Sequence, residues 1–241
     1  MGNSVAVSIV SHGHGEMVTR LIAQLRSCPE VTRIVLTLNI PEQLTIKEDS
    51  VVRVAGNQSP KGFGANHNAA FLQCNEPFFC VLNPDIALEG DHFPLLVESL
   101  GKYLGAALVA PRIVSPAGQV EDSARRFPTL SSLFCKALGG KKGTYEAVDG
   151  NNVFYPDWVA GMFMLFRSAD YAALGGFDES FYLYYEDVDI CKRISLAGRQ
   201  VLVCSSVQAV HDARRASHRN LRHLRWHLTS MLRFVWKYRK R

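Results

Sequence analysis

The chain has 241 residues and a formal net charge of +5, and its 47% hydrophobic and 20% charged residues are typical of a globular protein with a substantial core. No apolar run approaches the ~20 residues of a membrane-spanning helix, and residues 1–10 lack the basic and long apolar regions of a secretory signal. The six cysteines form no C-x-x-C pair, so neither a zinc knuckle nor a redox motif is indicated. We expect reduced, buried thiols in a cytoplasmic protein.

Residues 5–110 alternate between apolar, β-branched runs and segments with helical periodicity. This alternation predicts an α/β fold with a mostly parallel central sheet and helices on both faces. The predicted strands are 5–10, 31–38, 51–55, 77–82 and 106–110, and the predicted helices are 16–26, 63–74 and 91–103. Ligands of such sheets bind outside the carboxyl ends of the strands, which directs attention to the loops 11–15, 39–43, 56–62 and 83–86.

The second half of the chain is less regular. Glycine-rich stretches make residues 115–156 a loop region, which we expect to be mobile over a site and to contain a short helix near 130–138. The remaining predicted elements are a strand-like run at 158–167, a short helix at 168–174 capped by Ser168 and ended by Gly175-Gly176, strands at 200–204 and 207–211, and a last helix at 217–238.

Three carboxylates stand at the start of a helical pattern that follows an aromatic run: Glu186, Asp187 and Asp189. Acids are common in the first turn of a helix, where the helix dipole stabilises negative charge. Asp189 fits that interpretation, because Lys192 and Arg193 lie one turn further on and can pair with it. Glu186 and Asp187 have no such partner, and the aromatic residues before them would raise a carboxylate's pKa toward that of a general base.

Two other strand ends carry side chains that bind metals in other proteins. Asp85 follows a buried strand in Leu82-Asn83-Pro84-Asp85, and His211 closes the apolar run that begins at Val207. Either can be structural, the Asp as a turn cap and the His as a strand-end residue. Arg125-Arg126 can meet a pyrophosphate or be solvated.

The segment Gly62-Phe63-Gly64-Ala65-Asn66 opens a predicted helix, so its backbone amides can approach a phosphate. Phe63 can equally be a core residue and Gly62 a plain turn. The segment is neither G-x-G-x-x-G nor a P-loop. The absence of both motifs disfavours an NAD enzyme and an ATPase.

Residues 213–241 contain ten Lys or Arg and no acid, whereas the rest of the chain has 17 basic and 22 acidic residues. A basic amphipathic helix with Trp226, Phe234 and Trp236 near its apolar stripe suits an anionic membrane surface. A helix packed on the core with a solvated basic face is the alternative. No helix-turn-helix or zinc-finger spacing supports nucleic-acid binding.

Taken in order, these elements resemble family 2 glycosyltransferases of the GT-A fold, and among them the rhamnosyltransferase-like members that build bacterial surface polysaccharides such as O-antigen. The resemblance spans roughly residues 5–211. It rests on Val7-Ser8-Ile9-Val10-Ser11, Gly62-Phe63-Gly64-Ala65-Asn66, Leu82-Asn83-Pro84-Asp85, residues 158–167, Gly175-Gly176-Phe177-Asp178-Glu179, Glu186-Asp187-Val188-Asp189-Ile190-Cys191 with Arg193 and Ala197-Gly198, and His211.

The resemblance implies an inverting transfer of a sugar from a nucleotide diphosphate to an acceptor hydroxyl. By this resemblance the first donor to expect is dTDP-L-rhamnose and the second is a UDP-hexose. The expected acceptor is a lipid-linked or lipopolysaccharide-type glycan. By the family pattern Asp187 is the general base and Glu186 supports it. Asp85 helps to hold a divalent metal, Mg²⁺ or Mn²⁺, and His211 reaches the metal or the diphosphate. A binding protein of the same fold without catalysis is the alternative from another class.

The resemblance also divides the chain into a catalytic domain of residues 1–212 and the basic helical segment 213–241, which would contact the inner face of the cell membrane peripherally. Residues 1–110 would form the nucleotide-sugar half and 111–212 the acceptor half. The nucleotide-sugar residues would be Ser11, His12, Asn39, Gly62, Gly64, Asn66, Asn83 and Asp85, and the acceptor residues Trp158, Gly161 and Tyr185.

Two stretches depart from the family pattern. Thr37-Leu38-Asn39-Ile40-Pro41 stands where members commonly have a Val-Asp-Asn-like run that contacts the base, and Ser11-His12-Gly13-His14 replaces an Asn-Tyr-Asn-like strand ending. Either departure can signal an altered donor.

Overall fold

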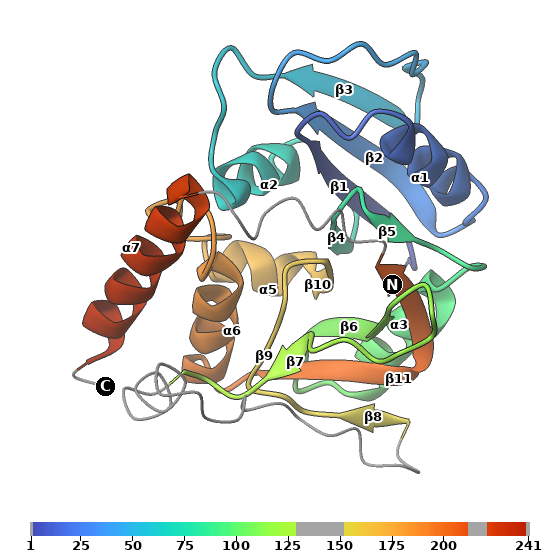
Figure 1. The fold of residues 1–241 in the computed structure, drawn as a ribbon. Coiled ribbons are helices and arrows are strands. Elements are labelled where there is room, and N and C mark those ends of the chain that lie inside the picture. Colours follow the sequence, from blue (N-terminus) through green and yellow to red (C-terminus); the bar gives the residue numbers. More distant parts are fainter. Residues whose placement is uncertain (1, 129–151, 212–220, 240–241) are drawn as a thin grey trace.

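A central mixed sheet dominates the computed structural model, which describes residues 2–128, 152–211 and 221–239 (Figure 1). Its strand order is β3-β2-β1-β4-β10-β6-β11-β5, and β8 pairs with β11 beside this path. The strands are β1 (Val5–Ser11), β2 (Val31–Leu38), β3 (Val52–Gly56), β4 (Phe78–Leu82), β5 (Ile86–Ala87), β6 (Ala106–Val114), β8 (Val153–Phe154), β10 (Phe163–Arg167) and β11 (Gln200–His211).

The first half of the sheet is parallel, because β1 pairs in parallel with both β2 and β4, and β2 with β3. β10 runs antiparallel between β4 and β6, and β6 and β11 are parallel again. A small second sheet joins β7 (Ala124–Arg125) to β9 (Trp158–Val159). The prediction of a mostly parallel sheet is therefore confirmed.

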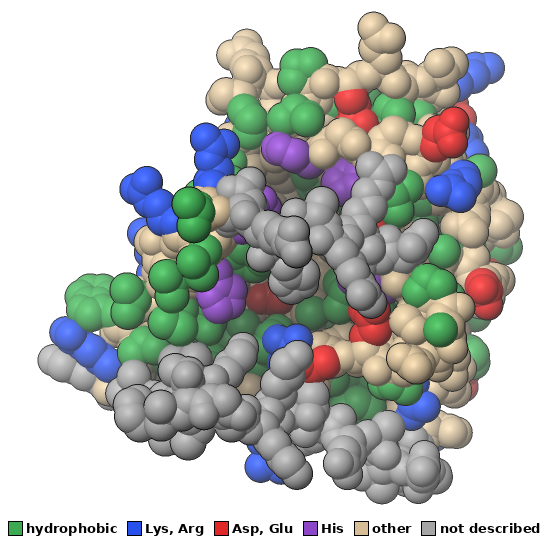
Figure 2. Space-filling view, in the orientation of Figure 1, with side chains coloured by type: hydrophobic (Ala, Val, Ile, Leu, Met, Phe, Trp, Pro, Cys, Tyr) green, Lys and Arg blue, Asp and Glu red, His purple; other side chains and the backbone are tan. Residues whose placement is uncertain are grey.

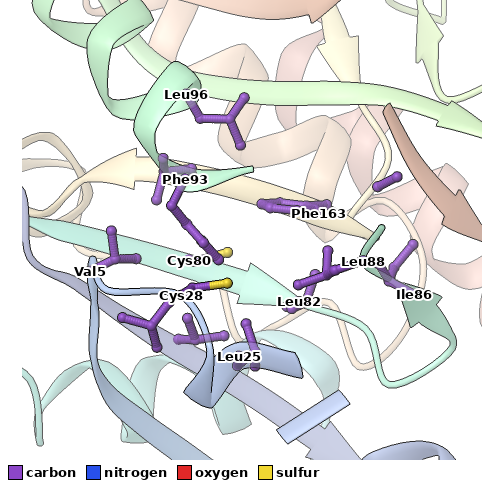
Figure 3. Packing of buried hydrophobic residues seen from close by; sticks show 14 of the residues in the cluster. Val5, Leu25, Cys28, Cys80, Leu82, Ile86, Leu88, Phe93, Leu96 and Phe163 are labelled. Carbon is purple, nitrogen blue, oxygen red and sulfur yellow. The ribbon is translucent and has the colours of Figure 1, made fainter. Parts of the chain in front are cut away.

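Helices cover both faces of the sheet, as expected. They are α1 (Glu16–Arg26), α2 (Phe63–Phe71), α3 (Phe93–Lys102), α5 (Ser168–Ala173), α6 (Glu186–Leu196) and α7 (Leu221–Tyr238). α1 and α3 pack on one face through residues such as Leu25, Phe93 and Leu96, which lie with Val5, Cys80 and Leu82 in Figure 3. α5, α6 and α7 pack on the other through residues such as Tyr171, Ile190 and Phe234.

Several element boundaries differ from the sequence predictions. Ser168 is not the cap of α5: Arg167 precedes the helix, no side chain caps it, and the Ser168 hydroxyl donates to the carbonyl of Glu76 at 2.6 Å. The two strands expected at 200–204 and 207–211 are one strand with an irregularity between Cys204 and Gln208. The strand-like run at 158–167 is interrupted between β9 and β10.

Part of the predicted 115–156 loop and its short helix near 130–138, together with residues 212–220, lie outside the described residues. Within the part of the chain that is described, no helix combines the length and the apolar character needed to cross a bilayer. The described cysteines are unpaired thiols, and all but Cys74 are buried, in agreement with the expectation. The division into domains stays a prediction.

Candidate active site

Asp85 and His211 are brought together by a short antiparallel pairing at the edge of the sheet. β5 pairs with the end of β11, and His211 lies opposite Ile86, the residue after Asp85. As a result the Nε2 atom of His211 lies 3.3 Å from a carboxylate oxygen of Asp85. The sequence placed these residues 126 positions apart, and the strand pairing supplies their contact.

Glu121 is a third member of this corner. Its carboxylate lies 2.7 Å from Nδ1 of His211, so the imidazole lies between two carboxylates. The hydrogen bond to Asp85, more than any other contact, raises the pKa of His211 to about 9. Sequence reasoning missed Glu121, because it stands in the irregular stretch after β6 and no motif marks it.

The Asp85–His211 pair fits a divalent metal that is shared with a bound diphosphate. The second carboxylate oxygen of Asp85 is buried and has no hydrogen-bond partner among the described residues. Those residues contain no group of three or more side chains arranged to hold a metal by themselves. Nucleotide sites commonly bind Mg²⁺ through one or two side chains and complete its coordination with phosphate oxygens and water. A metal would take His211 in its neutral form and so displace the proton of the metal-free pair.

Glu186 and Asp187 begin α6 directly after two residues with left-handed backbone. Tyr184 and Tyr185 have φ angles of 70° and 69°, which are unusual for side chains of this size. This turn directs the chain into α6 so that Glu186 is buried and Asp187 is half-buried. Strained backbone of this kind clusters at functional sites, where the surrounding structure holds it in place.

Two backbone amides fix the Asp187 carboxylate. The N–H of Gly161 donates to one oxygen at 3.1 Å, and the N–H of Val188 donates to the other at 2.8 Å. Gly161 stands in the break between β9 and β10, and the carbonyl of Met162 next to it accepts the N–H of Asn83 at 2.9 Å. One short segment thus links the Asn83–Asp85 strand end to Asp187.

The surroundings of Glu186 and Asp187 shift the pKa values of the two carboxyl groups differently. Burial raises the pKa of Glu186 well above its ordinary value, and the neighbouring charge of Asp187 raises it further. Burial also raises the pKa of Asp187, but the amides of Val188 and Gly161 and the positive charge of Arg125 oppose that rise. Negative charge on the pair is therefore best held on Asp187, while Glu186 keeps the proton.

Asp189 differs from its two neighbours, because it is a fully buried structural residue. Arg193 donates to it at 2.8 Å, which confirms the predicted ion pair. Lys192, the other predicted partner, lies over the ring of Phe127 instead. Lys237 and Tyr238 of α7 complete the cluster at 2.6 and 2.8 Å.

At the opposite end of the site, three amide side chains meet at the carboxyl ends of β2 and β3. Asn57 donates to Asn39 at 2.9 Å and to Asn66 at 2.6 Å. The imidazole of His12 lies 3.3 Å from Asn39, and the backbone N–H of Asn39 donates to the carbonyl of Ser11. Of the predicted nucleotide-sugar residues, Ser11, His12, Asn39 and Asn66 are therefore close together. Asn57 is the residue that joins them, and no motif revealed it.

An open cavity of about 620 Å³ adjoins this amide group. It is lined by Leu38, Ile40, Pro41, Glu42, Gln43, Gly56, Asn57 and Gln58. The side chain of Asn39 does not line it, and its amide is bonded to Lys61 and Asn57. The atypical 37–41 run thus contributes apolar groups to the wall of the cavity, and its amide groups come from Gln43, Asn57 and Gln58.

Gly62 and Gly64 lie where α2 meets the segment before α6. A side chain at Gly64 would place its first carbon 2.6 Å from Cβ of Phe177, and one at Gly62 would lie 2.7 Å from the carbonyl oxygen of Tyr182. The N–H of Phe63 donates to that same carbonyl. Close packing is therefore a sufficient reason for both glycines, and phosphate binding by this loop stays a prediction.

The predicted acceptor residues lie around Asp187. The indole N–H of Trp158 donates to the carbonyl of Arg126 at 2.9 Å, and the guanidinium of Arg125 lies 5.1 Å from the centre of its ring. Tyr185 packs against Phe234 of α7. In the face drawn in Figure 2, acidic and histidine side chains gather toward the middle, between the β1–β3 half and α7.

Two curated relatives align with most of this chain. The chain is 29% identical to rhamnosyltransferase WbbL of Escherichia coli (strain K12), over 96% of this chain and 92% of that protein. It is 24% identical to the N-acetylglucosaminyl-diphospho-decaprenol L-rhamnosyltransferase of Mycobacterium tuberculosis, over 88% of this chain and 76% of that protein. The chain is a glycosyltransferase, and its sequence is similar to those of rhamnosyltransferases. No family model matches it.

Solved structures give this glycosyltransferase the GT-A fold. GalNAc-T7 with UDP, GalNAc and Mn²⁺ aligns with a TM-score of 0.71 at 15% identity, over 90% of this chain and 44% of that one. Mannosyltransferase PcManGT from Pyrobaculum calidifontis with GDP-Man and Mn²⁺ aligns at 0.61 and 13% identity, over 95% and 64%. The chain thus spans less than two thirds of either solved chain. Both of these solved structures contain Mn²⁺.

Proposed function

We propose that the glycosyltransferase transfers L-rhamnose from dTDP-L-rhamnose to a hydroxyl of a lipid-linked or lipopolysaccharide-type glycan, with inversion at the anomeric carbon. The observation that carries this proposal is the setting of Asp187, a half-buried carboxylate that two backbone amides hold beside Glu186, whose pKa is raised well above its ordinary value by burial. The choice of rhamnose is supported by the names of both relatives.

Asp187 would act as the general base. As the acceptor oxygen bonds to the anomeric carbon, its proton moves to the Asp187 carboxylate, and the bond from that carbon to the diphosphate breaks. A single displacement of this kind occurs on the face opposite the leaving group and therefore inverts the configuration. Glu186 supports the base by staying neutral, so that the two carboxyl groups carry one negative charge.

Asp85 and His211 would hold a divalent metal, Mg²⁺ or Mn²⁺, on the donor diphosphate. When bound, this metal offsets the negative charge that develops on the leaving group. Glu121 would then keep the His211 ring in place through its contact with Nδ1, in the manner of other carboxylates behind metal-binding histidines.

The remaining predicted residues divide between the two substrates. We assign the nucleobase to the cavity beside Ile40 and Pro41, with Asn57 as its amide wall, and assign Ser11, His12, Asn39, Gly62, Gly64, Asn66 and Asn83 to the nucleotide-sugar side. Trp158, Gly161 and Tyr185 shape the acceptor side. Residues 213–241 would hold the enzyme peripherally at the cytoplasmic face of the membrane, where a lipid-linked acceptor lies. No nucleic-acid partner is proposed.

A donor panel tests this function. The purified enzyme is incubated with Mn²⁺ or Mg²⁺, an N-acetylglucosaminyl diphospholipid and dTDP-L-rhamnose, UDP-galactose, UDP-glucose or UDP-N-acetylglucosamine, and products are analysed by mass spectrometry and NMR. We expect a rhamnosylated product of inverted anomeric configuration. Transfer of a hexose instead of rhamnose would show that the donor is a UDP-hexose. A retained anomeric configuration would refute the single displacement. Nucleotide binding with neither sugar transfer nor donor hydrolysis would indicate a binding protein.

A further inference from the structure

α7 has two apolar faces, and the fold uses only one of them. Phe234 and Ser230 are buried on the inner face. On the other face five large apolar side chains are exposed, and we call them the outer stripe: Leu221 (82% exposed), Leu224 (55%), Leu228 (45%), Leu232 (64%) and Trp236 (66%). Their spacing of three or four residues places them along one side of the helix.

The inner face is already fixed by directional contacts. The Ser230 hydroxyl donates to the carbonyl of Leu183 at 2.9 Å, and the ring centres of Trp226 and Tyr182 are 4.9 Å apart. Lys237 donates to Asp178 and Asp189 at 2.7 and 2.6 Å. These contacts account for the position of α7 without the outer stripe. Scattered exposed leucines are ordinary, but five aligned on one helix mark an interaction surface.

Basic residues border the outer stripe. Arg222, Arg225 and Arg233 are exposed on α7, and the guanidinium of Arg239, directly after the helix, lies 5.1 Å from the ring centre of Trp236. Figure 2 shows hydrophobic and basic side chains interleaved along the edge where Figure 1 places α7. The absence of any acid from the sequence 213–241 makes this surface complementary to negative charge throughout.

We infer that the outer stripe is the surface that enters an anionic lipid bilayer, with α7 lying parallel to the membrane plane. Leucine and tryptophan would enter the boundary between headgroups and acyl chains, and the arginines would contact anionic headgroups, as in other interfacial helices. A second copy of the chain is disfavoured as the partner, because it would bring two basic surfaces together. The inference rests on the proposed function only for the choice of a membrane as the partner.

A bilayer on the outer stripe would also lie close to the predicted acceptor side of the site. The inner face of α7 contacts residues 182–185, the turn that leads directly into Glu186 and Asp187. A bilayer bound to the outer stripe is therefore one helix diameter from the start of α6. A lipid-linked acceptor could reach Asp187 without leaving the membrane.

Vesicle co-sedimentation tests the surface directly. The probes are vesicles of phosphatidylcholine alone and of phosphatidylcholine with phosphatidylglycerol, and the test variant carries Leu224→Gln, Leu228→Gln and Leu232→Gln. We expect the wild type to bind the anionic vesicles and the triple variant to bind at least about tenfold more weakly, because three apolar side chains no longer leave water. The control variant Leu72→Gln/Leu104→Gln changes two other exposed leucines and should bind like the wild type.

Three results would overturn the inference: equal binding of the triple variant and the wild type, no binding of the wild type to anionic vesicles, or a wild-type dimer that the triple substitution converts to a monomer without any vesicle binding. Thermal unfolding confirms that the triple variant is folded. Transfer to a water-soluble acceptor should be unchanged in that variant. Vesicle binding by a wild type that transfers no sugar would refute the proposed function and leave the inference standing.

Discussion

Replacing Glu186 by Gln should stabilise the protein at alkaline pH and leave most of its activity. Glu186 is 5% exposed, and its Oε2 atom has no hydrogen-bond partner among the described residues. Its pKa is raised in the folded state, so the folded protein binds this proton more tightly than the unfolded chain does. Stability from this group is therefore complete below the unfolded pKa and is lost as the pH rises toward the folded pKa.

The size of the effect follows from the same linkage. Each unit by which the folded pKa exceeds the unfolded one removes about 1.4 kcal/mol of stability at a pH above both. Glutamine has the shape of the protonated acid and cannot ionise, so the variant avoids this loss. At about pH 5 the two proteins should be similar, and by about pH 8.5 the variant should be more stable, with a gain of roughly 2–4 °C in Tm for each kcal/mol.

Thermal and urea unfolding across this pH range measure the difference, and Glu98→Gln on the exposed side of α3 controls for the loss of a surface glutamate. A stability difference between Glu186→Gln and wild type that does not grow with pH would refute the assignment of the proton to Glu186. Activity gives a second readout. If the variant loses transfer as completely as an Asp187 variant, Glu186 is itself the ionised base.

Three further changes test other parts of the site. Asp85→Ala should weaken Mn²⁺-dependent binding of the donor nucleotide by at least about tenfold in calorimetric titration, because the metal loses a carboxylate ligand. Arg125→Gln should move the acid limb of the kcat–pH profile to higher pH, because the charge that lowers the pKa of Asp187 is removed. Gly64→Ala should cost about 1–3 kcal/mol in urea unfolding, because its new methyl group would lie 2.6 Å from Cβ of Phe177.

For each of these substitutions, one result would contradict the prediction. Nucleotide titration with Mn²⁺ that is unaffected by Asp85→Ala would remove Asp85 from the metal site. An acid limb that stays in place or moves to lower pH would show that Arg125 does not act on the base. Gly101→Ala is the control for Gly64, because nothing lies within 4 Å of a methyl group there and the exposed helix should gain about 0.5–1 kcal/mol. Equal effects at both glycines would refute the packing argument.

Much of the fold could be predicted because its signals are local. The bounds expected for α1 and β2 agree with the structure, since apolar periodicity and strand composition are properties of short windows. The break between β9 and β10 was not predicted, because every residue from 158 to 166 other than Gly161 is apolar, and this hides the turn that places Gly161 against Asp187. The sequence also did not reveal which side of α7 packs: Phe234 and Tyr238 lie against the core, whereas Leu228 and Leu232 are exposed.

The site was predictable where a residue belongs to a motif and not where it depends on tertiary contact. Asp85, His211 and Asp187 each stand at or beside the end of an element that the pattern revealed, so their places in the fold could be predicted. Glu121 and Asn57 stand in loops and acquire partners only when distant strands meet. The difference between the pKa values of Glu186 and Asp187 likewise depends on burial and on two backbone amides, and residue spacing alone does not reveal either.

The most direct test of the account is the turnover of an Asp187→Asn variant with dTDP-L-rhamnose and a glycan diphospholipid. The variant keeps the shape of the side chain but loses the proton acceptor, so we predict a ~10²–10⁴-fold fall in kcat. Binding of the donor nucleotide, measured by calorimetry on the same sample, should be largely unchanged. Turnover at the wild-type rate would contradict the assignment of Asp187 as the base, and with it the proposed mechanism.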